Sequence, residues 1–167
     1  NPTLMRKAGV ADYKAFALQV LEVVGGRPIS FEVFADAFDE MEKQALEIAS
    51  WGKNVNVKIP VTNTKGESSL HLITKLSESI KLNVTAIMTM EQVRSVARSL
   101  NPSMPAVISI FAGRVNDTGR SVEGLFTAAR HVKHDLTKIL WASTRQIYSV
   151  TEADRLCDII TLPAEMY

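Results

Sequence analysis

Hydrophobic and polar positions follow two patterns that alternate from one end of the chain to the other. Alternation at every second residue predicts strands at 28–34, 54–60, 81–88, 106–111, 138–143 and 158–163, and residues 1–3 fit the tail of another strand. Helical spacing predicts helices at 10–24, 36–52, 67–79, 90–100, 121–136 and 144–156. Regular alternation of strands and helices predicts an α/β fold with a parallel sheet.

Some helix ends carry their own signals. Asp36 is expected to cap the start of the 36–52 helix and Gly52 to end it. Thr89 is expected to cap the helix that begins at the next residue.

The predicted strands carry polar residues near their carboxyl ends, on one parity in each strand. In NVNVKIP, Lys58 lies opposite a valine and isoleucine face, and Pro60 ends the ladder because it has no N–H to donate. The other such positions are Glu32, Asn83, Thr85, Ser109 and Ser143. A closed barrel would bring these side chains together at its C-terminal mouth, whereas an open sheet would spread them along an edge. No G-x-G-x-x-G or Walker A motif follows a strand, which favours the barrel.

A lysine in such a mouth has a specific chemical use. Desolvation favours the neutral amine, which can attack a ketone or aldehyde and form a Schiff base. The iminium is an electron sink that permits cleavage of the adjacent C–C bond, and Glu32 and Thr85 are candidates for the proton transfers. The alternative is a lysine at the rim that extends into solvent or pairs with Glu32.

The composition narrows the class of protein but does not indicate a function. The 167 residues are 46% hydrophobic and 22% charged, which is typical of one globular domain, and the net charge of +1 gives no nucleic-acid footprint. Cys157 is the single cysteine, so no internal disulfide forms and a reducing compartment is expected. No apolar run approaches a membrane span and no leader is present, so we expect a cytoplasmic protein.

Other individual residues have simpler interpretations. His131 and His134 lack a third ligand, so neither a metal nor another cofactor is expected. Trp141 is expected to be a packing residue, although its parity with Ser143 also allows a place inside the barrel. Cys157 precedes a buried strand and is expected to be inert.

Five motifs together resemble the transaldolase family, in the family's order. They are VKIPVTNTKG (57–66), LNVTAIMTMEQ (82–92), SIFAGRVNDTGR (109–120), ASTR (142–145) and CDIITLP (157–163). NPTLM, at the start, resembles the loop after the family's second strand. The resemblance implies one (β/α)8 TIM-barrel domain over residues 1–167, lacking in this chain the first strand and the terminal helix, with class I aldolase chemistry.

The resemblance also assigns roles residue by residue. Lys58 matches the Schiff-base lysine, Thr85 the threonine that holds the catalytic water, and Glu32 the glutamate that acts with it. The positions matched to substrate binding are Asn1, Thr3, Asn83, Ser109, Phe111, Arg114, Ser143 and Arg145.

Three of these substrate positions bear on the choice of substrate. Arg114 and Arg145 match a pair that binds the phosphate end, a task that suits guanidinium groups, although the residues alone also allow salt bridges at the rim. Related fructose-6-phosphate aldolases carry tyrosine in place of Phe111, so Phe111 favours transfer of a three-carbon unit.

The chain also departs from the family pattern. No residue matches the catalytic aspartate of the family's first strand, so we expect the functional protein to be longer. Seven strands alone would leave two open edges. Small members of the family form ring-shaped oligomers, so a homo-oligomer is expected.

The expected function is transfer of a dihydroxyacetone unit from a ketose phosphate, or a similar anionic ketose, to an aldose acceptor. One alternative is an aldolase of the fructose-6-phosphate type that releases free dihydroxyacetone. Another is a non-catalytic barrel that binds sugar phosphates. A small anionic sugar is the expected partner, with neither nucleic acid nor membrane, and the residues do not distinguish phosphate from sulfonate or carboxylate.

Overall fold

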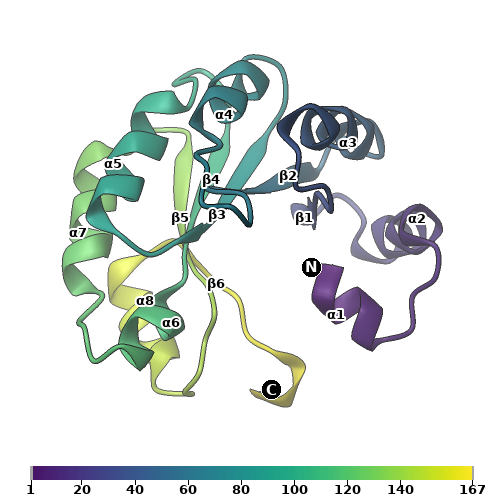
Figure 1. The fold of residues 1–167 in the computed structure, drawn as a ribbon. Coiled ribbons are helices and arrows are strands. Elements are labelled where there is room, and N and C mark those ends of the chain that lie inside the picture. Colours follow the sequence, from purple (N-terminus) through teal and green to yellow (C-terminus); the bar gives the residue numbers. More distant parts are fainter. Residues whose placement is uncertain (1, 167) are drawn as a thin grey trace.

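Six strands form one parallel sheet in sequence order, in a computed structural model that describes the backbone of residues 2–166 and the side chains of residues 4–166. The strands are β1 (Ile29–Glu32), β2 (Val55–Pro60), β3 (Leu82–Ile87), β4 (Ala106–Ile110), β5 (Thr137–Trp141) and β6 (Ile159–Ile160). All six predicted strands are confirmed. The sheet curls, and β1 and β6 are its two edges within the described residues (Figure 1).

The helices follow the strands in alternation. They are α1 (Pro2–Lys7), α2 (Tyr13–Val24), α3 (Phe38–Ser50), α4 (Leu70–Ser77), α5 (Met90–Ser99), α6 (Ala112–Asp117), α7 (Glu123–Val132) and α8 (Ser149–Leu156), with a 3-10 turn at Ala164–Met166. Figure 1 shows α4, α5 and α7 along one face of the curled sheet, while α1 and α2 lie beyond β1. Within residues 2–166, no helix has the length and apolar character that crossing a bilayer requires.

The N-terminal residues correct one prediction. Pro2 and Thr3 lie in α1 and not in the tail of a strand, so the described sheet has six strands rather than seven. Proline suits the first turn of a helix because its missing N–H is not needed there. Asn1 lies outside the described residues.

Helix capping was predicted correctly in one place and wrongly in another. Thr89 caps α5 in a reciprocal capping box with Gln92. Asp36 does not cap α3, whose cap position is Ala37. The Asp36 carboxylate instead accepts hydrogen bonds from the backbone N–H and the hydroxyl of Thr64, at 2.7 and 2.8 Å. These bonds, led by the one from the backbone, lower the pKa of Asp36, and they tie the connection after β2 to the start of α3.

The core lies between the sheet and its covering helices. Trp141 is fully buried and stacks on Phe126 of α7, with ring centroids 5.1 Å apart. Trp141 is therefore a packing residue on the helix-covered face, and the possibility that it lines the inside of a barrel is wrong. Its neighbours Leu140 and Ala142 point to the other face of the sheet, where they line a cavity.

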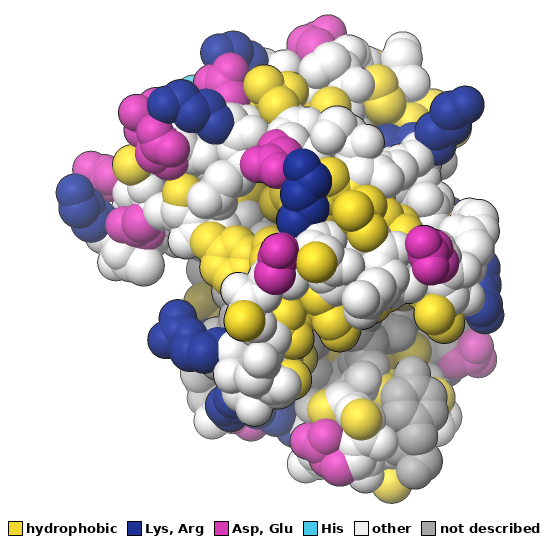
Figure 2. Space-filling view, turned by 90° about the vertical axis from the view of Figure 1, so that its right-hand side faces the viewer, with side chains coloured by type: hydrophobic (Ala, Val, Ile, Leu, Met, Phe, Trp, Pro, Cys, Tyr) yellow, Lys and Arg dark blue, Asp and Glu magenta, His cyan; other side chains and the backbone are white. Residues whose placement is uncertain are grey.

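Hydrophobic side chains are exposed on the side of the molecule near β1. Figure 2 views the molecule from the side of α1 and α2 and shows hydrophobic side chains gathered near the centre of that face. In this part of the chain Phe16, Leu18, Val23 and Phe34 are exposed hydrophobic residues. The side of the molecule near β1 therefore carries exposed apolar side chains.

Candidate active site

A cavity of about 800 Å³ lies on the face of the sheet opposite the core. Side chains from all six strands or their ends line it, among them Ser30, Lys58, Asn83, Ser109, Leu140 and Ile159. These residues come from neighbouring parallel strands, so the alternation of faces along each strand brings them to one surface. The predicted gathering of Lys58, Asn83 and Ser109 is therefore present in the structure.

Lys58 and Glu32 face each other across two neighbouring strands. The residues are register partners in the β1–β2 pair, and Lys58 Nζ lies 3.4 Å from Glu32 Oε2. Their side chains are 20% and 15% exposed, so the pair is largely screened from water but open on one side. This arrangement contains the ion pair that was considered as an alternative, and it also places a proton acceptor beside the amine.

A chain of hydrogen bonds runs across the sheet beside Lys58. Asn83 is the register partner of Lys58 on β3. Its side-chain oxygen accepts a hydrogen bond from the Ser109 hydroxyl at 2.6 Å, and its amide nitrogen donates to Ser30 Oγ at 2.9 Å. These bonds fix the orientation of the buried Asn83 amide. Ser30 was not among the predicted site residues. It lies two residues before Glu32 and therefore on the same face of the strand, which could have identified it from the sequence.

Thr85 lies next to an irregularity of β3. Its side chain is 1% exposed, and within the described residues its hydroxyl oxygen has no hydrogen-bond partner. The register of β3 against β4 shifts between Val84 and Ile87, and Ala86 adopts a left-handed φ of 62°. A non-glycine residue in this conformation is strained, and such strain concentrates at functional sites. Thr85 does not line the cavity, so the structure places it beside the site rather than in its wall.

Phe111 and Arg114 lie together after β4. Phe111 immediately precedes α6, and the guanidinium carbon of Arg114 lies 5.0 Å from the centre of its ring. Arg114 is exposed. Neither residue lines the cavity, so both belong to its surroundings at the carboxyl end of the sheet.

Ser143 and Arg145 follow β5 in a segment that contacts α6. A Cβ atom added to Gly113 would lie only 1.7 Å from the carbonyl oxygen of Ser143 and 2.7 Å from Arg145 Cγ, so α6 and this segment touch directly. Arg145 is exposed and its Nε lies 3.2 Å from Asp117 Oδ2. The salt bridge considered for the two arginines thus forms at Arg145, next to the helix that carries Arg114.

Two predicted substrate residues cannot be placed. Asn1 and the side chain of Thr3 lie outside the described residues, so their roles stay predictions. Within the part of the chain that is described, no cluster of three histidine, cysteine, aspartate or glutamate residues is arranged to hold a metal ion.

Cys157 is a poor candidate for chemistry. Its thiol is half-buried and donates to the carbonyl oxygens of Ala153 and Ile159, both at 3.3 Å. Burial is the main reason that the pKa of Cys157 is raised, which disfavours the nucleophilic thiolate at neutral pH.

Polar side chains gathered near the carboxyl edge of a curled parallel sheet are the arrangement in which α/β enzymes of the barrel type place their active sites. The sequence matches the Transaldolase/Fructose-6-phosphate aldolase family over residues 1–167. The chain therefore belongs to the transaldolase/fructose-6-phosphate aldolase family.

Individual relatives agree with this assignment. A "Probable transaldolase" of Dehalococcoides mccartyi is 33% identical over 168 residues, covering 98% of this chain and 74% of the relative. One of Lactiplantibacillus plantarum is 34% identical over 172 residues, covering 100% and 75%. One of Streptococcus agalactiae serotype V is 38% identical over 133 residues, covering 79% of this chain and 57% of the relative. The family and these names indicate a transaldolase-type enzyme.

Proposed function

We propose that the protein is a transaldolase that forms a Schiff base at Lys58 and moves a dihydroxyacetone unit from a ketose phosphate to an aldose. The observation that carries the proposal is the pair formed by Lys58 Nζ and Glu32 Oε2 at 3.4 Å, with Lys58 in the wall of a cavity of about 800 Å³. Family membership and the names of the relatives support the same chemistry.

The reaction follows from the properties of the amine. Neutral Lys58 Nζ adds to the ketone carbon of the donor, and loss of water gives an iminium ion. The iminium accepts the electron pair of the neighbouring C–C bond as it breaks, so the aldehyde fragment leaves and a three-carbon enamine stays on Lys58. The enamine attacks the carbonyl carbon of the acceptor, and hydrolysis of the new iminium releases the product and restores the amine.

Glu32 and Thr85 are proposed to handle the proton transfers. Glu32 is close enough to Lys58 to act on the protons of the amine, directly or through one water molecule. The buried Thr85 hydroxyl, which has no hydrogen-bond partner among the described residues, is suited to hold such a water. Asn83, fixed by Ser30 and Ser109, would then contact hydroxyl groups of the bound donor.

The anionic end of the substrate is proposed to bind at Arg114 and Arg145. Both arginines follow late strands of the sheet, at the edge where phosphate sites of α/β barrels lie. Both are exposed, and the partner of Arg145 is an exposed carboxylate that an incoming phosphate could replace. Contacts to the substrate are also proposed for Ser143, Phe111, Asn1 and Thr3, on the basis of the family resemblance.

Residues 1–167 are proposed to act as one domain of a (β/α)8 barrel. The two open edges, β1 and β6, are where further strands would pair to close the curled sheet. A homo-oligomer is proposed as well, on the basis of the family resemblance alone.

Borohydride trapping tests the Schiff base. The protein is incubated with fructose 6-phosphate and borohydride, and the adduct is located by intact mass and peptide mapping. We expect a covalent adduct on Lys58, and Lys58→Met should fold, form no adduct and lose all turnover. Lys138→Met is the matched control because Lys138 lines the same cavity and forms no salt bridge within the described part of the chain, so this variant should keep both the adduct and turnover.

Three outcomes would contradict parts of the proposal. Substantial turnover by Lys58→Met would exclude the mechanism. An adduct with release of free dihydroxyacetone, independent of any aldose acceptor, would favour the aldolase. No adduct with either fructose 6-phosphate or dihydroxyacetone would favour a non-catalytic sugar-phosphate-binding protein.

A further inference from the structure

A threonine that follows β5 joins the end of this strand to the end of β6. The Thr144 hydroxyl donates a hydrogen bond to the carbonyl oxygen of Thr161 at 2.7 Å. Thr144 is 5% exposed, so the bond is screened from water. In the sequence Thr144 lies between Ser143 and Arg145, the two residues of this segment that are proposed to contact the substrate. Because Thr144 is buried, it can affect the substrate only through these neighbours.

The bond lies between two strands that are already paired with each other. β5 and β6 are parallel neighbours, and the Thr161 N–H donates to the Trp141 carbonyl oxygen at 3.0 Å. In a parallel ladder the N–H and the carbonyl of one residue face the same neighbouring strand, so the Thr161 carbonyl also faces β5. A further strand that pairs with the other side of β6 would therefore leave this bond in place.

The Thr144 hydroxyl takes the place of a main-chain donor. In a regular parallel ladder the Thr161 carbonyl would accept a bond from the N–H of Ser143, two residues after Trp141. Ser143 instead has a left-handed φ of 62°, which turns the chain out of the strand. A non-glycine residue in this conformation is strained and stays there only where its surroundings hold it. The side-chain bond from the next residue is one of the contacts that hold it.

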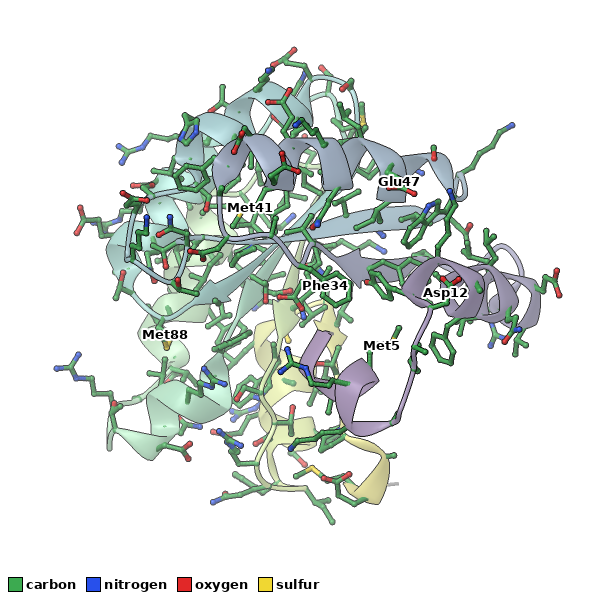
Figure 3. The ribbon with its side chains drawn as sticks, turned by 45° about the vertical axis from the view of Figure 1, so that its right-hand side comes forward. Met5, Asp12, Phe34, Met41, Glu47 and Met88 are labelled. Atoms are coloured by element: carbon green, nitrogen blue, oxygen red, sulfur yellow. The ribbon has the colours of Figure 1, made fainter. Side chains whose placement is uncertain are left out.

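A second contact that holds Ser143 comes from α6. A Cβ atom added to Gly113 would overlap the Ser143 carbonyl oxygen and crowd Arg145 Cγ, so α6 packs directly on this segment. In Figure 3, Phe34 and Met88 mark the carboxyl ends of β1 and β3, at the same edge of the parallel sheet as the segment after β5. The segment is thus in contact with α6 and tied to β6 at the edge where the substrate is proposed to bind.

We infer that Thr144 is a positioning residue for the anionic end of the substrate: it holds Ser143 in its left-handed turn and so sets the direction in which Arg145 leaves the sheet. Arg145 is exposed and has a long, flexible side chain, so a fixed backbone limits where its guanidinium group can go. Its Nε lies 3.2 Å from Asp117 Oδ2 on α6. The inference rests on the proposed function, because Arg145 must bind the anionic end for its direction to matter.

The test compares Thr144→Val with the unchanged protein, because valine keeps the branched shape and replaces only the hydroxyl. We expect KM for fructose 6-phosphate and the inhibition constant of inorganic phosphate to rise together by about three- to tenfold, the factor that one hydrogen bond gives. The value of kcat should stay within about twofold. Borohydride trapping of dihydroxyacetone, which has no phosphate, should be unchanged. A general loss of stability would not separate these ligands below the unfolding temperature.

Two control variants separate the hydroxyl bond from other effects. Thr144→Ser keeps a hydroxyl and should bind phosphate nearly as tightly as the unchanged protein; binding as weak as in Thr144→Val would overturn the inference. Ser77→Ala removes another buried hydroxyl, at the end of α4, which donates to the Thr74 carbonyl oxygen at 3.0 Å and accepts from the Asn101 N–H at 3.1 Å. It should lower stability and leave KM unchanged. An equal KM rise in Ser77→Ala and Thr144→Val would assign the effect to stability and contradict the inference.

Further outcomes decide the remaining cases. In an Arg145→Met background, Thr144→Val should add little to the phosphate inhibition constant if Thr144 acts through Arg145, and an undiminished further rise contradicts the inference. An active protein whose Thr144→Val variant keeps its KM and its phosphate affinity overturns the inference alone. An unchanged protein that gives neither adduct nor turnover ends the proposed function and this role with it.

A second substitution covers the case in which Thr144→Val does not fold. Thr144→Cys places a small side chain at this position whose thiol is only a weak donor. The inhibition constant of inorganic phosphate should rise in this variant too, by a smaller factor. A constant equal to that of the unchanged protein would overturn the role of the hydroxyl.

Discussion

At the scale of single residues, the site combines paired and unpaired polar groups. Asn83 has partners on both sides, Ser30 and Ser109, and is therefore fixed. The Thr85 hydroxyl is buried and has no partner within the described residues. A protein keeps such a group at a cost in stability, because an unsatisfied buried hydroxyl is unfavourable. The unfavourable burial of this hydroxyl is explained if Thr85 takes part in the reaction.

The variant Thr85→Val tests whether the Thr85 hydroxyl takes part in the reaction. Removing an unpartnered buried hydroxyl should leave the free energy of unfolding unchanged or raise it by about 1 kcal/mol, while kcat falls about tenfold or more. Denaturant unfolding and transfer kinetics measure the two effects. Thr137→Val is the matched control, because Thr137 is equally buried, its hydroxyl also lacks a partner among the described residues, and it lies at the other end of its strand. Equal kcat losses in both variants would contradict a special role for Thr85.

The titration of Tyr13 makes the free energy of unfolding depend on pH in the alkaline range. Burial raises the pKa of folded Tyr13 to about 12, while the unfolded residue loses its proton near pH 10. The folded state therefore binds more protons between these values, and stability that is complete below pH 10 falls as pH rises towards 12. Because the group is partly in contact with solvent, we expect about 1 kcal/mol.

Unfolding by denaturant at pH 9 and pH 11.5 measures this effect. The loss between the two values should be larger in the unchanged protein than in Tyr13→Phe, which has no group to titrate at this position. Equal losses in the two proteins would show that Tyr13 does not change its pKa on folding.

At the scale of elements, the connections at the carboxyl edge were harder to predict than the strands and helices. The alternation of patterns predicted all six strands and most of the helices because each element has a clear hydrophobic face. No helix was predicted at α6, because its six residues, AGRVND, are too few to show helical periodicity. Asp36 has the residue type of a helix cap, but Thr64, 28 residues away, supplies donors that it binds instead. The residues around Asp36 do not indicate that a partner so distant in the sequence will bind it.

Gly113 is needed where two of these connections meet. A methyl group at Gly113 would overlap the backbone carbonyl of Ser143, so Gly113→Ala must displace α6 or the segment after β5. We expect a loss of about 2 kcal/mol in the free energy of unfolding and weaker binding of the anionic substrate, because Arg145 would move as well. Thermal unfolding and KM measure these effects.

Gly124→Ala is the matched control for this prediction. The nearest atom to a Cβ at Gly124 is Met90 Cε at 3.9 Å, an ordinary contact, and Gly124 lies within α7. Its replacement should leave stability unchanged or raise it, since alanine favours the helix. A Gly113→Ala variant as stable as Gly124→Ala would mean that the contact with Ser143 yields easily.

At the scale of the whole molecule, strand parity predicted which polar residues would gather, and tertiary structure decided how they interact. Lys58, Glu32, Asn83 and Ser109 come together because they occupy equivalent places on neighbouring parallel strands. The contact of Tyr13 with β1 was not predictable, because α2 meets this strand only in the folded molecule, through ring packing and hydrogen bonds to Glu32.

The strict strand order from β1 to β6 has a consequence for how the molecule is made. Each new strand pairs with the strand synthesised just before it, so its main contacts reach back only one strand–helix unit. A parallel pair can form only after the connection between its two strands has been made, and domains can begin to fold while synthesis continues. On a ribosome, the partnership of Glu32 and Lys58 could therefore form before Ser109 or Arg145 has been added to the chain. The chemical centre of the site would be in place first, and the groups that select its substrate would be assembled around it.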